Sequence, residues 1–362
     1  MKRKSMLALL LAAVLGLSGC SMLDQIVSKK QTSTQTSAES EQPVEIDTED
    51  GVPFIETMAE ADSAGSETEL ADEQEETFMV VPDTESEMQV GTETESEAEA
   101  LQEPVSTIVK EVIAKREAMN ERWAVGYEDL ASGEVCGYHD TKVMQSASVV
   151  KLFIMGAVYR YMCYPKEGEE AISFGEEHEG QLRETINKMI TVSDNDAANL
   201  LVDRLGEGDF KKGAELVGEF CKENGYTGTS LGRRFLDPNP TDDNYTTAAD
   251  TRKFLSDIYH GKLINEEASA KMLEVVKAQA LKNKIPAGLP EGFTSGNKTG
   301  EMPEGYNLGC IENDVAIVFP PEGKGEGYIL TILSNELAGR NNEAITEFSK
   351  MSSMVAQWYL NQ

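Results

Sequence analysis

The chain has 362 residues, and 64 acidic side chains against 32 basic ones give it a formal net charge of −32. Between residues 31 and 103 there are 23 acidic residues and no lysine or arginine, so about nine negative charges remain for everything else. An acidic balance of this size excludes a nucleic-acid partner. Because the acidity is confined to one segment, it indicates no cationic partner for the rest of the chain.

The N-terminus has the pattern of an export signal. A basic stretch at residues 2–4 precedes an apolar run at residues 6–15. This run is shorter than the roughly 20 residues that a membrane-spanning helix needs. The tetrapeptide at residues 17–20 (LSGC) resembles a bacterial lipoprotein signal, which implies removal of residues 1–19 and acylation of Cys20. We therefore expect an extracytoplasmic protein that is lipid-anchored to the bacterial cell membrane; an ordinary secretory signal with an incidental cysteine is the alternative.

Residues 20–103 are expected to form an acidic, disordered tether behind the lipid. From residue 31 onward the segment is rich in Ser, Thr, Glu and Ala, and chains of this composition bury too little apolar surface to fold. Two short apolar stretches, at residues 52–55 (VPFI) and 78–81 (FMVV), leave open the alternative that the tether carries docking motifs.

Residues 104–362 are long enough for one sizeable domain or for two lobes that share a cleft. In chain order the apolar patterns predict a helix over 108–119, strands over 123–130 and 135–138, helices to about residue 280, strands near 293–299, 307–319 and 327–335, and a final helix with an apolar stripe over 345–358. This order predicts an α/β (α+β) fold, with a five-stranded antiparallel sheet flanked by helices and a separate helical lobe. The active site is expected between the two.

A hydroxyl and an amine lie one helical turn apart at Ser148 and Lys151, at the start of an apolar helix. Residues at i and i+3 share a helix face, so these side chains can touch as a nucleophile and its base must. A lysine accepts the serine proton only if burial or a nearby cation lowers its pKa, and the apolar residues 152–155 offer burial. The spacing alone is a weak signal, because it recurs from Ser295 to Lys298.

Two further motifs make the first one specific. Residues 193–195 are Ser-Asp-Asn, and residues 298–300 are Lys-Thr-Gly. With these three motifs in this order, the chain resembles the class A serine β-lactamases and the penicillin-binding proteins, which include D-alanyl-D-alanine peptidases. Similar sequence is found at residues 190–201 (ITVSDNDAANLL) and 285–290 (IPAGLP), and the resemblance covers roughly residues 104–361.

The resemblance implies a role for each residue of the first two motifs. Ser148 would be the nucleophile and Lys151 its base. Ser193 would relay a proton towards the leaving nitrogen, and Asn195 would donate a hydrogen bond to the amide carbonyl of the substrate. Asp194 is interpreted as structural, capping or bracing a loop.

The third motif would hold the substrate carboxylate. The resemblance gives this role to Lys298, which we expect to face a solvent cleft, and to the hydroxyl of Thr299. Repulsion by Lys298 would also help to keep Lys151 deprotonated. Lys284 occupies a place where some family members carry a second, carboxylate-binding arginine.

The same resemblance assigns the oxyanion hole to two backbone N–H groups, those of Ser148 and Glu301. Gly300 would let the strand edge approach the ligand.

The segment over residues 229–247 departs from the family pattern. Class A β-lactamases carry an Arg-x-Glu-Pro-x-x-x-Asn loop here, and its glutamate positions the water that hydrolyses the acyl-enzyme; this segment contains no glutamate. Alignment on Arg233 puts the expected position at about Phe235, whereas alignment on Thr246 and Thr247 puts a gap of a few residues inside the loop. Three aspartates remain as substitutes, Asp237, Asp242 and Asp243. We expect acylation to survive and deacylation to be slow, because loss of a positioned base typically costs about 10² to 10⁴ in rate.

The four cysteines after Cys20 allow three disulfide pairings, between which the sequence does not choose; they are Cys136, Cys163, Cys221 and Cys310. No Cys-x-x-Cys spacing or zinc-protease motif is present, so we expect neither a metal nor a cofactor. The scarcity of histidine also disfavours a Ser-His-Asp triad.

Three hypotheses of different kinds remain. The first is a serine β-lactamase-like hydrolase that forms an acyl-enzyme with β-lactams through Ser148. The second is a cell-wall D-alanyl-D-alanine peptidase that is inhibited by penicillins. The missing glutamate and the tether favour this hypothesis. The third is a binding or sensing module for β-lactams or peptidoglycan that does not turn over. In each case the partner is a small β-lactam or a peptidoglycan stem peptide, and the chain is expected to be a monomer.

Overall fold

The computed structural model describes residues 101–175, 180–302 and 310–362. The expected signal peptide, the lipidated Cys20 and the tether with its two apolar stretches lie outside the described residues, apart from the last three residues of the tether. Within the described ranges, no helix combines the length and the apolar composition that crossing a membrane would require.

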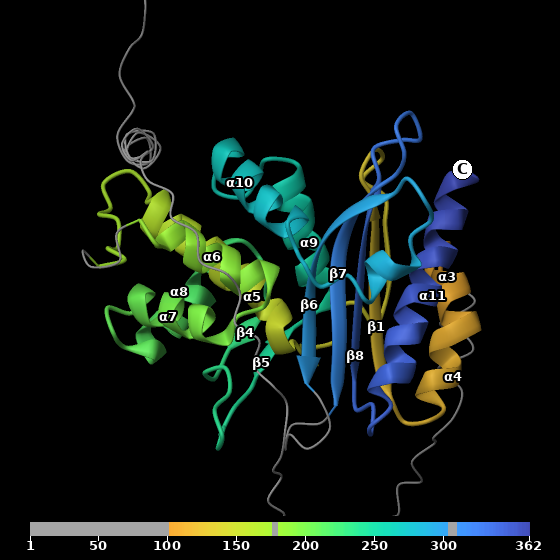
Figure 1. The fold of residues 1–362 in the computed structure, drawn as a ribbon, viewed down its shortest axis with the longest axis horizontal. Coiled ribbons are helices and arrows are strands. Elements are labelled where there is room, and N and C mark those ends of the chain that lie inside the picture. The colour runs from red at the N-terminus through yellow and green to blue at the C-terminus, as the bar shows by residue number, and fades with distance from the viewer. Residues whose placement is uncertain (1–100, 176–179, 303–309) are drawn as a thin grey trace, which may run out of the picture. The chain divides into compact units, whose positions relative to one another are not determined.

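The main sheet has five antiparallel strands in the order β2-β1-β8-β7-β6 (Figure 1). Its strands are β1 (Arg122–Asp129), β2 (Val135–Tyr138), β6 (Thr294–Met302), β7 (Ile311–Phe319) and β8 (Tyr328–Asn335). Each corresponds to a strand predicted from the sequence, with the ends shifted by a few residues. Because β6 pairs only with β7, its outer edge leaves backbone groups available to another partner.

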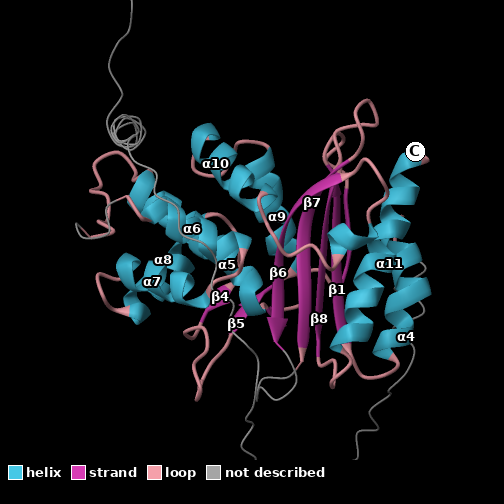
Figure 2. Ribbon diagram, in the orientation of Figure 1, coloured by secondary structure: helices cyan, strands magenta, loops and turns pink. Residues whose placement is uncertain are grey.

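One face of the sheet is covered by the two ends of the domain (Figure 2). The final helix is α11 (Asn341–Leu360), and it lies beside a helical segment formed by α3 (Val105–Ile108), η1 (Val109–Ile113) and α4 (Ala114–Glu117). The predicted stripe of α11 is buried at Phe348, Met351 and Val355, and Phe348 lies 5.6 Å from the ring centroid of Trp123 on β1. This cluster fixes the back of the sheet and leaves the other face for the site.

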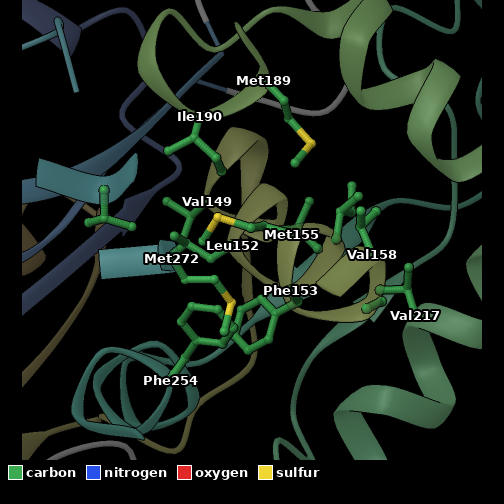
Figure 3. Close-up of a cluster of buried hydrophobic side chains, with 14 of the residues drawn as sticks. Val149, Leu152, Phe153, Met155, Val158, Met189, Ile190, Val217, Phe254 and Met272 are labelled. Carbon is green, nitrogen blue, oxygen red and sulfur yellow. The ribbon is translucent and has the colours of Figure 1, made fainter. Parts of the chain in front are cut away.

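The opposite face packs against a helical lobe. Its elements are α5 (Lys151–Val158), η3 (Tyr159–Cys163), α6 (Leu182–Thr191), α7 (Asn195–Leu205), α8 (Phe210–Glu223), α9 (Ala248–Tyr259) and α10 (Glu266–Lys277). All eight residues of α5 are buried. Figure 3 shows Leu152, Phe153 and Met155 of α5 among side chains of the surrounding helices, which are Met189, Ile190, Val217, Phe254 and Met272. The helix that begins at Lys151 is therefore the centre of the lobe.

A second, three-stranded sheet was not predicted. Its strands are β3 (Met144–Gln145), β4 (Ser230–Leu231) and β5 (Asn244–Thr246), in the order β3-β5-β4. Strands of two or three residues leave no alternating pattern for a sequence to display. This sheet ties the loop before α5 to the segment over 229–247, so it joins two parts of the site.

The four cysteines within the described ranges are free thiols, so none of the three possible pairings is formed. Cys221 and Cys310 are buried, whereas Cys136 and Cys163 are half-buried.

Candidate active site

Ser148 lies in a 3₁₀ turn, η2 (Ala147–Val150), between β3 and α5. The carbonyl of Ser146, two residues earlier, accepts a hydrogen bond of 3.1 Å from the side-chain amide of Asn313 on β7. Ala147 has φ = 45°, which costs free energy for any residue except glycine and is often found beside functional groups. Ser148 is half-buried while its neighbours in η2 are buried, so its side chain is held at the edge of the lobe.

Lys151 is completely buried, and its Nζ has three hydrogen bonds to neutral oxygen atoms. These are the Ser193 carbonyl at 2.7 Å, the Ser193 hydroxyl at 3.3 Å and Asn195 Oδ1 at 2.7 Å. Burial lowers the pKa of Lys151 to about 7, against an opposing effect of the Asp194 carboxylate. An amine with this pKa is a competent base near neutral pH.

Ser193 joins the two lysines of the site. Its Oγ lies 2.9 Å from Lys298 Nζ on β6 as well as 3.3 Å from Lys151 Nζ. Ser193 has φ = 60°, a second strained backbone position at the site. The hydroxyl stands where a proton relay needs it, in reach of both amines.

Lys298 does not face a solvent cleft, as the sequence had suggested, but is fully buried. Its Nζ donates to Ser193 Oγ and, at 2.7 Å, to the carbonyl of Thr299. Burial and then the nearby charge of Lys151 lower the pKa of Lys298 well below its ordinary range. Two buried ammonium groups that share one hydroxyl oppose each other's protonation, so the expected repulsion between them is consistent with this geometry.

The remaining residues of the Ser-Asp-Asn motif have separate tasks. Asp194 is the N-cap of α7, and its side chain accepts a hydrogen bond of 2.8 Å from the Ala197 N–H, which confirms the structural interpretation. Asn195 presents its oxygen to Lys151, which leaves its NH₂ group to donate elsewhere.

Gly300 lies where β6 packs against the turn that carries Ser148. A Cβ atom at Gly300 would lie 2.7 Å from the Ser146 carbonyl oxygen and 3.1 Å from the Ser148 nitrogen. The absence of a side chain at Gly300 therefore lets β6 pack closely against the backbone of residues 146–148, in addition to the expected approach to a ligand. It keeps the edge strand, and with it the backbone of Glu301, next to the Ser148 N–H, as an oxyanion hole requires. Thr299 is buried on this strand.

Lys284 lies against the Lys-Thr-Gly strand, with its Nζ 3.5 Å from the Gly300 carbonyl oxygen, but its charge is engaged by carboxylates of the protein. It is completely buried, and its Nζ forms ion pairs of 2.5 Å with Glu312 and 3.1 Å with Glu301. It also donates to the carbonyl of Asn313 at 3.2 Å. An ammonium engaged in this way supports the join between β6 and β7 and is not available to a substrate carboxylate.

Phe235 covers the base. Its ring centroid lies 4.5 Å from Lys151 Nζ, and the side chain is buried. Asn199 on α7 holds the backbone on both sides, accepting from the Phe235 N–H at 3.0 Å and donating to its carbonyl at 3.1 Å. The preceding turn is fixed by an ion pair of 2.7 Å between buried Arg233 and Asp243.

The family model for the beta-lactamase enzyme family matches residues 104–163 and 166–359. The chain belongs to this family. A beta-lactamase from Streptomyces albus G is 24% identical over 256 residues, which are 64% of this chain and 77% of that relative. Beta-lactamase AST-1 from Nocardia asteroides is 32% identical over 148 residues, which are 39% of this chain and 43% of that relative.

Solved structures give the same fold. A variant of the class A beta-lactamase of the last common ancestor of Gram-negative bacteria superposes with a TM-score of 0.56 at 22% identity, covering 70% of this chain and 98% of that one. PBP-A superposes with a TM-score of 0.56 at 20% identity, covering 72% of this chain and 99% of that one. A PBP-A variant with a TM-score of 0.56 and 20% identity, covering 71% of this chain and 98% of that one, is described as an acyl-enzyme complex with penicillin G. The α/β fold with its five-stranded antiparallel sheet is thus that of the class A beta-lactamases.

The three loop aspartates are exposed or have hydrogen bonds within their own region. Asp237 accepts a hydrogen bond from the Asn239 N–H, and Asp242 is exposed. Asp243 is engaged by Arg233 and Gln145. In the part of the chain that the structure describes, no carboxylate has a hydrogen bond to Lys151. The same ranges contain no cluster of three or more side chains suited to binding a metal ion.

Two residues that support the site, Asn199 and Asp314, are not apparent from the sequence. Asn199 was not singled out, because an amide in the middle of a helix gives no signal until its partner is known. Asp314 on β7 is completely buried and accepts from Asn297 Nδ2 at 2.9 Å, beside Lys298. Burial raises the pKa of Asp314 to about 6. The polar run Glu312-Asn313-Asp314 at the start of a strand that is otherwise apolar was the available signal.

Proposed function

We propose that this chain is a serine hydrolase of the β-lactamase type that is acylated at Ser148 by β-lactams and releases the acyl group slowly. The observation that carries the proposal is the joining of Lys151 and Lys298 by the Ser193 hydroxyl. Lys151 begins the helix one turn after Ser148, and Lys298 lies on β6, which contacts the turn that carries Ser148. Buried, depressed-pKa amines beside an activated serine are the requirement of acyl transfer, whereas a fold has no need of them.

In the proposed reaction the neutral Lys151 amine takes the proton of Ser148, whose Oγ forms a bond to the carbonyl carbon of the β-lactam. The electron pair of the carbonyl moves to its oxygen, which the Ser148 and Glu301 N–H groups stabilise. The carbon–nitrogen bond then breaks, and the proton passes from the Lys151 ammonium through Ser193 to the leaving nitrogen. A substrate carboxylate that approaches β6 would favour the protonated form of Lys298, which would then attract it.

Slow release follows from Phe235. A phenyl ring cannot accept a proton from water, yet Phe235 stands at the chain position where the alignment on Arg233 expects the glutamate of class A enzymes, and its ring centroid lies 4.5 Å from Lys151 Nζ. Without a positioned base, hydrolysis of the acyl-enzyme should be slower by about 10² to 10⁴.

A D-alanyl-D-alanine peptidase of the cell wall is the second candidate function, and Phe235 favours it as well. An enzyme that need not hydrolyse penicillin gains nothing from a base suited to that purpose. The likeness to PBP-A, a variant of which is described with bound penicillin G, supports this candidate. A module that binds or senses β-lactams without turnover is the third candidate.

We also propose that Cys20 carries lipid, so that the enzyme acts outside the cytoplasm on the membrane, as a monomer. In cells, a labelled fatty acid should enter the full chain and not a Cys20→Ala variant. Equal labelling of the two would contradict this part of the proposal.

Pre-steady-state kinetics tests the function. With a chromogenic β-lactam, we expect a burst equal to the enzyme concentration, followed by a slow steady rate. Release of D-alanine from a peptide ending in D-Ala-D-Ala would favour the peptidase, and its absence together with slow β-lactam turnover would favour the β-lactamase-like hydrolase. A fast steady rate without a burst would contradict slow deacylation.

A further inference from the structure

We propose that Phe235 is a positioning residue for acylation, which covers the Lys151 amine, keeps water from it and so holds it ready to take the Ser148 proton. This inference rests on the proposed function. It assigns Phe235 a role in acylation. This role is separate from the absence of a base for deacylation.

The cover is built into the fold. Phe235 is 7% exposed and Lys151 is 0% exposed, so the ring and the amine meet in the interior. The two hydrogen bonds between the Asn199 side chain and the Phe235 backbone fix this backbone, which limits the positions that the ring can adopt. The next residue, Leu236, is 59% exposed and has φ = 61°, so the chain turns outward at once behind the ring.

Few charges act on the amine that Phe235 covers. Its hydrogen-bond partners are Ser193 and Asn195, which are neutral. On α7 the Asp194 carboxylate favours the ammonium, and on β6 Lys298 opposes it. The loop adds an apolar ring in place of an anion, so the protonation of Lys151 depends mainly on how well water is excluded.

The ring has two opposing effects on the lysine. Its face attracts the ammonium, which supports the protonated form by up to about one and a half pKa units. Its bulk removes water and so contributes to the burial that lowers the pKa of Lys151 from 10.5 to about 7. Another apolar side chain at position 235 should therefore keep the pKa of Lys151 low. A smaller side chain that leaves a cavity, or a polar side chain, should let that pKa rise.

The experiment is the pH dependence of the acylation rate with benzylpenicillin, measured by quenched mass spectrometry on the full chain. The wild type should show a midpoint near pH 7. In Phe235→Ala and Phe235→Gln the midpoint should rise by about one unit or more, so that at low pH acylation is about tenfold slower. In Phe235→Leu the midpoint should stay within about half a unit or fall slightly. The exposed neighbour supplies a matched control, Leu236→Ala, in which the midpoint should not move.

An unchanged midpoint in the Gln variant, or an equal rise in the Leu variant, would overturn the role of Phe235 while leaving acylation at Ser148 intact. If the Ala variant does not fold, the Gln and Leu variants decide between these outcomes. A wild type that is acylated at no pH would instead overturn the proposed function and this inference together.

Discussion

The proposed chemistry depends on Lys151 and Lys298, and both residues are buried beside the same hydroxyl. Their motifs were recognisable in the sequence because nucleophile and base must be one helical turn apart. Their burial was not, and Lys298 was expected to face solvent. The partner of Lys284 was not predictable either. The sequence does not reveal whether this lysine binds a substrate or, as in the structure, forms an ion pair with Glu312.

The buried base predicts an unusual dependence of stability on pH. The pKa of Lys151 is about 7 in the folded protein and near 10.5 when unfolded, so between these values the unfolded state binds more protons. The free energy of unfolding should therefore rise with pH across this window. The free-energy cost of burying the protonated Lys151 should be fully present below pH 7. Lys151→Met should remove a penalty of the order of a few kcal/mol at pH 6 and of about 1 kcal/mol or less at pH 10. Urea unfolding of both proteins across this range provides the measurement; a difference between them that does not vary with pH would contradict the assignment.

A carboxylate at position 235, in place of the ring that covers Lys151, should speed release of the acyl group. In Phe235→Glu the backbone held by Asn199 would present a base near Lys151, and the lifetime of the penicillin adduct should shorten by about 10² to 10⁴. Phe235→Gln is the matched control, because it has the same length and no base. Asp237→Asn should leave the lifetime unchanged, since Asp237 bonds only to its own turn at Asn239. Equal lifetimes in the Glu and Gln variants would show that this position does not serve deacylation.

At the scale of elements, the site is a contact between an edge strand and a short turn. The strands and helices of the domain could be predicted, because each is long enough to show its period. The small sheet that connects β3 with β5 could not, although it holds the turn before Ser148. The close approach of β6 to η2 was indicated only by the glycine of Lys-Thr-Gly.

Gly300→Ala tests that approach. The added Cβ would lie 2.7 Å from the Ser146 carbonyl oxygen, so strand and turn must separate. We expect acylation to slow by roughly 10 to 10²-fold, because small displacements at a reacting centre are costly. Gly288→Ala, whose Cβ would lie 1.8 Å from the Ser349 carbonyl oxygen, should destabilise the fold through η5 (Ile285–Gly288) and α11. Measured well below its melting temperature, the Gly288 variant should acylate at the wild-type rate; equal slowing in both variants would mean that the effect is one of stability.

At the scale of the whole domain, two apolar clusters lie on opposite faces of the sheet, and the site lies where the sheet meets the lobe. The order of helices and strands made this division predictable. The state of the cysteines was not predictable, since it depends on distances between segments far apart in the chain.

The free thiols predict that a reductant has no effect on stability. Burial raises the pKa of Cys136 to about 11 and that of Cys221 to about 12, so few reactive thiolates are present at neutral pH. The melting temperature of the full chain should be the same with and without dithiothreitol. A lower melting temperature in the reductant would reveal a disulfide that stabilises the fold.

The intact mass of the protein after mixing with benzylpenicillin tests the central claim most directly. We predict that the wild type gains the mass of one penicillin, that the adduct lies on Ser148 and that it persists after free penicillin is removed. Ser148→Ala should remain folded and gain no mass. A folded Ser148→Ala variant that is still labelled, or a wild type that destroys penicillin while never accumulating an adduct, would contradict the account.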